Sequence, residues 1–158
     1  MVSTLEQLKE FVVHPIFLSG ILSWLSAQFI KTVAALLLGK IKDIKELIAL
    51  LLWRTGGMPS SHSALVSSVA TSMGFITGFN SEIFILTMCF TLVVIRDSVG
   101  VRRASGIQAR TINEIGQTLQ KKGIIEYTPI KEVHGHKPLE VLIGCLLGLF
   151  IGIGFSVL

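Results

Sequence analysis

Charged residues are scarce in this sequence. Asp, Glu, Lys and Arg make up 15% of its 158 residues, hydrophobic residues make up 51%, and the mean hydropathy is +0.71. Since a soluble domain carries about 25% charged residues, this composition excludes an ordinary soluble protein. The sequence instead predicts one membrane-embedded domain, residues 1–158, with a small polar face.

Cysteine is also scarce, and Cys89 and Cys145 both stand inside apolar segments. We expect both to be buried as small hydrophobic residues, so the sequence predicts neither a disulfide nor a cysteine-based metal site. Segment 1–14 is charged, and no small-residue cleavage pattern follows it, so we expect no cleaved signal. The net charge of +4 comes without a basic-aromatic module, which favours anionic lipid headgroups over nucleic acid as partners.

Long apolar runs dominate the rest of the chain. The polar loop 100–137 interrupts them, and we expect a helix over its residues 107–119. Residues 1–14 are predicted to form an amphipathic helix that lies on the membrane surface or covers the bundle. The predicted fold class is therefore all-α, an integral membrane bundle of about four spanning helices. We interpret four segments as these spans: Ile16–Leu38, Ser61–Phe79, Glu82–Val99 and Pro138–Val157.

The basic residues gather in two segments, the connector 39–55 and the loop 100–137. Two spans separate these segments, so both lie on the same side of the membrane. The positive-inside rule places that side in the cytoplasm and both termini on the opposite side. We expect the membrane to be a bacterial plasma membrane. The short apolar core of the connector, 47–53, lies at the interface with Trp53 at headgroup level.

Two patterns inside the spans predict specific contacts. Gly144, Gly148 and Gly152 recur every four residues, which is typical of a small-residue packing stripe. Gln28 and Lys31 are three residues apart in the first span and share a helix face. A lysine within a span is costly, so Lys31 either faces a functional cavity or snorkels to the interface.

The polar stretch Gly56–Ser63 opens the second span. Its glycines and Pro59 interrupt the regular backbone, and one of its serines caps the helix that follows. The first-turn amides of a capped helix bind anions, and an imidazole there, His62, can bond or protonate a phosphate oxygen. A capped helix with a surface histidine is the alternative, and this stretch alone does not separate the two.

A second histidine cluster opens the last span, where His136 precedes Glu140 by four residues. On a helix these side chains share a face, and the carboxylate can fix the imidazole tautomer and strengthen its other nitrogen as a nucleophile. A surface ion pair is the alternative. With His62 present, the sequence favours a pair of histidines in which one attacks phosphorus and the other protonates the leaving oxygen, while Arg and Lys hold the phosphoryl oxygens.

These motifs resemble those of a known superfamily. Segment 136–144 resembles the third motif of the type 2 phosphatidic acid phosphatases, in which a nucleophilic His stands four residues before an Asp, and 59–62 (Pro-Ser-Ser-His) is similar to their second motif, Pro-Ser-Gly-His. Segments 56–62, 97–103, 106–109 and 135–136 resemble the divergent branch that is labelled acid phosphatase or vanadium-dependent haloperoxidase related. The resemblance extends from about Gln28 to Gly148.

The resemblance implies a membrane phosphatase that hydrolyses a lipid phosphate or pyrophosphate without a metal or another cofactor, and that vanadate inhibits. His136 would be the nucleophile that forms a phosphohistidine, Glu140 would orient it, and His62 would be the general acid. The other implied residues bind phosphate (Arg103, Arg102, Ser61, Ser60 and Lys31) or support the site (Asp97, Gln28 and Gln108).

Departures from the superfamily pattern keep other hypotheses open. The first motif, Lys then six residues then Arg-Pro, is absent, and Arg103 lies far upstream of His136. A non-catalytic membrane protein that binds phospholipid headgroups through a relic of the site is consistent with these changes. A metal site of His62, His134 and His136 is a further hypothesis, although no fourth ligand has matching spacing. Haloperoxidation with bound vanadate is the last of these hypotheses.

Overall fold

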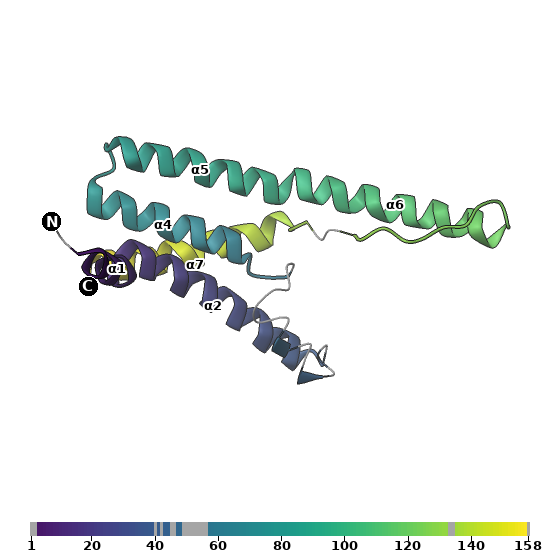
Figure 1. Cartoon of the computed structure of the whole chain (residues 1–158), viewed down its shortest axis with the longest axis horizontal. Coiled ribbons are helices and arrows are strands. Elements are labelled where there is room, and N and C mark those ends of the chain that lie inside the picture. Colours follow the sequence, from purple (N-terminus) through teal and green to yellow (C-terminus); the bar gives the residue numbers. More distant parts are fainter. Residues whose placement is uncertain are drawn as a thin grey trace.

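The computed structural model describes residues 3–39, 41, 43–44, 47–48, 57–132 and 135–157. Its helices in these ranges are α1 Thr4–Val13, α2 Pro15–Leu37, α4 Ser61–Thr77, α5 Glu82–Val99, α6 Val101–Lys121 and α7 Pro138–Val157 (Figure 1). No strand occurs in the described ranges, so the prediction of an all-α fold is confirmed. The predicted interfacial stretch around Trp53 and all the basic residues of the connector lie outside the described residues.

Helix α4 lies at the centre of the bundle, with α2, α5 and α7 packed around it (Figure 1). Its contact with α7 runs backbone to backbone. A Cβ on Gly144 would meet the Ser60 carbonyl, a Cβ on Gly148 would meet the Ala64 carbonyl, and Gly152 continues the stripe one turn further along α4. All three glycines are buried, so the predicted small-residue packing stripe is confirmed.

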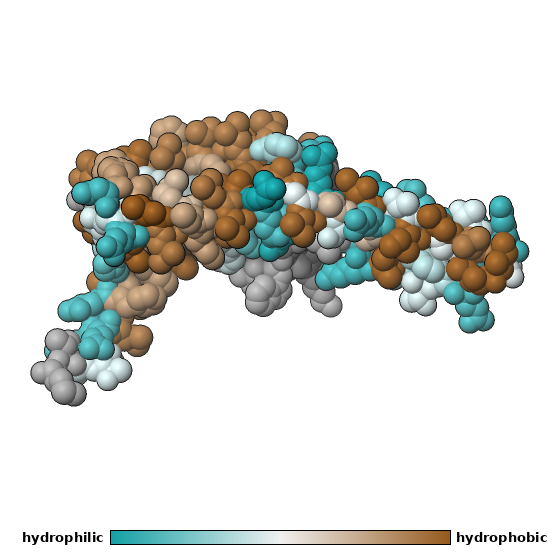
Figure 2. Space-filling view, turned by 90° about the horizontal axis from the view of Figure 1, so that it is seen from above, coloured by the Kyte–Doolittle hydropathy of each residue, from teal (hydrophilic) through white to brown (hydrophobic). Residues whose placement is uncertain are grey.

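Small and polar side chains fill the core of the bundle. Its largest fully buried side chains are serines, and the Ser72 hydroxyl joins α4 to α2 by donating to Ser19 Oγ at 2.9 Å. Large apolar side chains instead face outward and cover the bundle surface, as Figure 2 shows. This arrangement suits a lipid environment, where small residues allow close helix packing and apolar residues contact lipid.

Helix α5 also turns its large apolar side chains outward, and one of its residues contradicts a prediction. It packs on α4 through a single face, where the Thr91 hydroxyl donates to the Val66 carbonyl at 3.3 Å. Cys89 lies off that face and is exposed, so the prediction that both cysteines are buried is wrong for this residue; Cys145 is partly buried, and both are free thiols.

Three stretches of helix are long and apolar enough to cross a membrane: α2, the α5–α6 segment Glu82–Lys121, and α7. Helix α4 has 17 residues, and by length and composition it is not among them. The prediction of about four spans is therefore met for three of the four predicted segments.

Helix α6 follows α5 across Gly100 and projects beyond the bundle (Figure 1). The loop helix predicted over residues 107–119 is present, but the predicted range is shorter than α6, which begins at Val101. The Gly100 N–H donates to the Arg96 carbonyl at 2.8 Å, and the Ala104 N–H donates to the Gly100 carbonyl at 2.9 Å. Backbone hydrogen bonding thus passes through Gly100, and one glycine does not separate the two helices.

The segment that follows α6 is anchored along it. Gly123 has φ +71° and directly follows Lys122, the C-cap of α6. The ring of Tyr127 covers Gly116, and Asn113 Oδ1 accepts both the Tyr127 hydroxyl at 2.6 Å and the Ile130 N–H at 2.9 Å. Helix α6 and residues 124–132 therefore form one arm, which leads the chain back toward the bundle.

Helix α1 meets α2 at His14. A capping box between Ser3 and Glu6 begins α1, and His14 Nδ1 accepts the Ile16 N–H at 3.3 Å at the start of α2, whose first residue is Pro15. Helix α1 is seen almost end-on in Figure 1 and contains no buried residue. Its Phe11 ring packs on Phe17 of α2 at a centroid distance of 4.5 Å, so α1 covers the start of α2, which is one of the two locations that the sequence left open.

Candidate active site

The stretch before α4 forms a turn and a capped helix N-terminus. Gly57 has φ +87°, a left-handed conformation that favours glycine. Ser60 is the N-cap, and its hydroxyl oxygen accepts the Ser63 N–H at 3.4 Å. Ser60 and Ser61 are buried, whereas His62 is exposed. The prediction of a serine-capped helix is therefore confirmed, with Ser60 as the capping residue.

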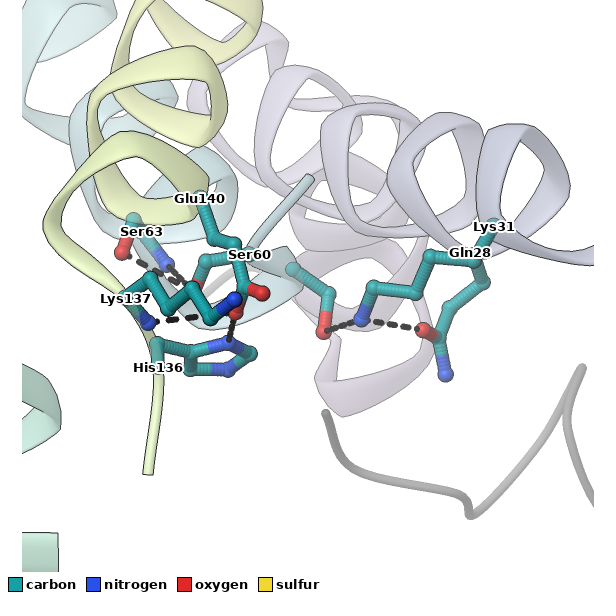
Figure 3. Close-up of polar contacts among 8 residues, drawn as sticks. Gln28, Lys31, Ser60, Ser63, His136, Lys137 and Glu140 are labelled. Carbon is teal, nitrogen blue, oxygen red and sulfur yellow. Dashed lines mark hydrogen bonds and ion pairs between the residues drawn. The ribbon is translucent and has the colours of Figure 1, made fainter. Parts of the chain in front are cut away.

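His136 lies just before α7 rather than on it. Its Nδ1 is 2.9 Å from Oε2 of Glu140, and the same oxygen accepts the Lys137 N–H at 3.3 Å (Figure 3). Glu140 is the third residue of α7, so its side chain reaches back over the helix start as the glutamate of a capping box does. The predicted pair is present, but the prediction that the two residues share a helix face is wrong, because capping geometry brings them together.

The carboxylate decides which nitrogen of His136 is available. An ionised carboxylate only accepts hydrogen bonds, so Nδ1 carries the proton and Nε2 keeps its lone pair in the neutral ring. His136 is 5% exposed, and its Nε2 has no hydrogen-bond partner among the described residues. The ring therefore presents a lone pair whose direction is held by Glu140.

The backbone next to His136 is held against the junction of α5 and α6. The His136 N–H donates to the Ser98 carbonyl at 3.3 Å. Gly135 lies so close to the backbone of Arg103 that an added Cβ would overlap it. Ser98 and Gly135 both stand in motif segments, although no role was predicted for Ser98, and this close approach explains why a glycine is needed at position 135.

Lys31 reaches the same region from α2. It is buried, and its Nζ donates to Gln28 Oε1 at 3.0 Å and to Ser61 Oγ at 3.3 Å. Figure 3 shows the Lys31 side chain extending from α2 toward the start of α4, with the His136–Glu140 pair on the far side of that turn. The charge of Glu140 acts on the Lys31 ammonium. Of the two predicted orientations, Lys31 therefore faces the cluster and does not snorkel.

Charged groups surround His62 at the start of α4. The ionisable groups that act on it electrostatically are Arg102, His136, Lys31 and Asp97. Arg102 Nε donates to Asp97 Oδ2 at 2.6 Å, and these side chains remain 48% and 38% exposed. The edge of the cluster thus carries an ion pair that is open to solvent, from which the Arg102 guanidinium can reach an anion.

Two predicted site residues contribute little through their side chains. Arg103 is exposed and contacts the site through its backbone at Gly135. Gln108 is exposed further along α6 and has no hydrogen bond to the described residues of the cluster. The structure brings the other predicted residues together: His136, Glu140, His62, Lys31, Gln28, Ser60 and Ser61, with Arg102 and Asp97 at the edge.

The third histidine of the metal hypothesis, His134, lies outside the described residues. Within the part of the chain that the structure describes, no group of three or more His, Cys, Asp or Glu side chains is placed to hold a metal ion. What the described residues offer is a lone pair on an oriented imidazole, a second imidazole and several cations.

Comparison with known proteins agrees with this arrangement. Residues 12–151 match the family described as "Divergent PAP2 family". A protein of Bacillus subtilis (strain 168) described as "Uncharacterized membrane protein YuiD" is 32% identical over 145 residues, which cover 85% of this chain and 89% of the relative. No solved structure matches the chain. With its apolar helices and these similarities, the chain is an integral membrane protein that belongs to the divergent PAP2 family.

Proposed function

We propose that this protein is a phosphatase that hydrolyses a lipid phosphate or pyrophosphate through a phosphohistidine. The observation that carries the proposal is the 2.9 Å contact between His136 Nδ1 and Glu140 Oε2, which leaves Nε2 as a nucleophile beside a cationic cluster. A surface ion pair, the alternative for this motif, is less consistent with a histidine that is 5% exposed.

The reaction has two displacements at phosphorus. In the first, His136 Nε2 forms a bond to phosphorus while the bond to the leaving oxygen breaks, and His62 gives that oxygen a proton. In the second, a water attacks the phosphohistidine, His62 accepts the water's proton, and the nitrogen–phosphorus bond breaks. Inorganic phosphate leaves for a monoester, and both histidines return to their starting states.

Cationic and hydrogen-bonding groups stabilise the charge on the transferring phosphoryl group. Lys31 and Arg102 supply positive charge, and Ser61 with the first amides of α4 supplies donors. In this proposal these groups perform the neutralisation that Mg²⁺ performs in most phosphoryl-transfer sites. Arg103 and Gln108 would take part only if their exposed side chains turn toward bound substrate.

The proposed location in the membrane follows from the same arrangement. Helix α4 is the fourth span, since 17 residues lie at the lower end of the range of about 17–25 that cross a bilayer, and it is shielded by three neighbours. The basic arm and the site face the cytoplasm, and both termini face away from it across a bacterial plasma membrane.

Phosphate release by detergent-purified protein tests the proposal. A panel of lipid monophosphates and pyrophosphates should include substrates that release phosphate, and vanadate should inhibit the release because it adopts the five-coordinate geometry of the transition state. The His136→Ala variant is the matched control and should be inactive. Absence of release across the panel by folded protein would overturn the phosphatase assignment.

A non-catalytic headgroup-binding protein is the second candidate, and the missing first motif favours it. The same sample separates the two functions. Phosphatidic acid that binds and shifts the unfolding temperature, with no phosphate released from any substrate, supports the binding protein. Release that His136→Ala abolishes excludes it.

A further inference from the structure

One face of α4 is left open between two of its neighbours. Helices α2 and α5 each pack on α4, but their described residues do not contact each other. Figure 1 shows α4 between them, with α7 on its other side. His62, Leu65 and Val69 follow one another at helical spacing on this open face, where His62 is exposed and the other two are partly buried. An apolar stripe thus leads away from the proposed general acid.

The stripe continues into an apolar cavity of about 420 Å³, which is open rather than enclosed. Leu65 and Val69 line it from α4, and α1 and α2 complete it. Among the described residues that line it, His14 is the only one with a polar side chain. Gly20 allows α2 to approach Val69 closely at the cavity, because a Cβ there would lie 2.9 Å from Val69 Cγ2. The wall contributed by α1 and α2 includes Phe11, Phe17, Gly20 and Ile21.

The two ends of this path have complementary chemistry. The end at His62 has the positive charges of Lys31 and Arg102, which suit a phosphate. Leu65 and Val69, where the cavity begins, lie only about 5–10 Å from His62 along the axis of α4, because an α-helix rises roughly 1.5 Å per residue. An occupant that satisfies both ends is an amphiphile with an anionic phosphate head and a long hydrocarbon chain.

We infer that the His62–Leu65–Val69 stripe and the cavity beneath α1 hold the hydrocarbon chain of the substrate. The inference rests on the proposed function for the phosphate end. Since the bilayer is itself apolar, the cavity gains little from burying a chain and acts mainly through its shape. A phosphate with a long chain is aligned by it, and a phosphate with a short chain is not.

A side chain that fills the cavity tests this inference. Val69→Trp should lower kcat/KM for hexadecyl phosphate by about tenfold or more and leave kcat/KM for butyl phosphate unchanged, because only the long chain reaches the filled space. Val93→Trp is the matched control, on the outer face of α5 where Val93 is 65% exposed, and should behave as wild type. Equal losses on both substrates, or no loss on either, overturn the inference. If Val69→Trp does not fold, Ile21→Trp fills the same cavity from α2.

Crosslinking separates this inference from the proposed function. Hexadecyl phosphate with a diazirine at the end of its chain should label peptides that contain Phe17, Ile21 or Val69. Such labelling without turnover of any substrate supports the chain-binding cavity and rejects the phosphatase. Turnover with labelling confined to the outer face of α5 supports the phosphatase and rejects the cavity.

Discussion

The backbone N–H of Ser60 donates to the carbonyl oxygen of Glu140 at 2.9 Å. This bond joins the N-cap of α4 to the first turn of α7, and so it joins the stretch that carries His62 to the stretch that carries His136. The approach is possible because Gly144 has no side chain to separate its helix from the Ser60 backbone. The relative position of the two histidines therefore depends on the glycine stripe of α7.

Enlarging that stripe should weaken the bundle. Gly148→Ala places a Cβ against the Ala64 carbonyl, and overpacking of this kind typically costs about 1–3 kcal/mol. Its unfolding temperature in detergent should fall below that of wild type. Gly154→Ala, at a helical glycine of α7 with nothing within 4 Å of the added Cβ, should unfold at or above the wild-type temperature. Indistinguishable unfolding temperatures would contradict the role of the stripe.

The proposed nucleophile and its carboxylate should respond differently to substitution. His136→Ala should abolish turnover, because no other group supplies the attacking nitrogen. Glu140→Gln keeps the shape of the side chain but removes its charge, so turnover should fall while the unfolding temperature stays near that of wild type. Acid-labile, alkali-stable phosphate should be trapped on wild-type protein and not on His136→Ala. Label on that variant would exclude His136 as the nucleophile.

The effect of removing His62 should depend on the leaving group. A general acid contributes about 10²–10⁴-fold, and most of this is lost only when the leaving group needs a proton. His62→Ala should therefore slow release from an alkyl phosphate far more than release from p-nitrophenyl phosphate. Rates on the two substrates give the comparison, and an equal loss on both would reject the role of His62 as the acid.

Three substitutions at the α5–α6 junction should differ in stability. Gly135→Ala should lower the unfolding temperature most, because its Cβ would overlap the Arg103 backbone. Asp97→Ala should lower it modestly, since an exposed ion pair such as that with Arg102 is worth roughly 0.2–1 kcal/mol. Arg103→Ala should change it least, because the backbone makes that contact. Thermal unfolding of all three in detergent gives the order, and a larger effect of Arg103→Ala than of Asp97→Ala would reverse our interpretation.

Cysteine labelling from outside intact cells tests the proposed topology. In a background without Cys89 and Cys145, a cysteine at Lys122 should not react with a membrane-impermeant maleimide, because the proposed topology places the basic arm in the cytoplasm. A cysteine at Asn80, in the turn between α4 and α5 on the opposite side, should react. Labelling at Lys122 alone would invert the topology and place the site outside the cell.

The sequence by itself determined the local features of this protein. A serine cap at the start of α4 depends on interactions within one helical turn, and the glycine stripe of α7 is visible as a four-residue spacing, although its contact with α4 is tertiary. The motif spacing also identified most residues of the cluster, because these residues lie near helix ends that meet at one end of the bundle.

Only the tertiary structure decided which faces are buried and how the motifs meet. In a membrane both the lipid and the bundle interior accept apolar residues, so hydrophobic periodicity did not show that Cys89 faces outward or that Lys31 points toward Ser61. The contact of Gly135 with Arg103 and the bond of Ser60 to Glu140 each join residues far apart in the chain. Contacts of this kind depend on how closely the helices pack, and that distance is set by all the side chains between them.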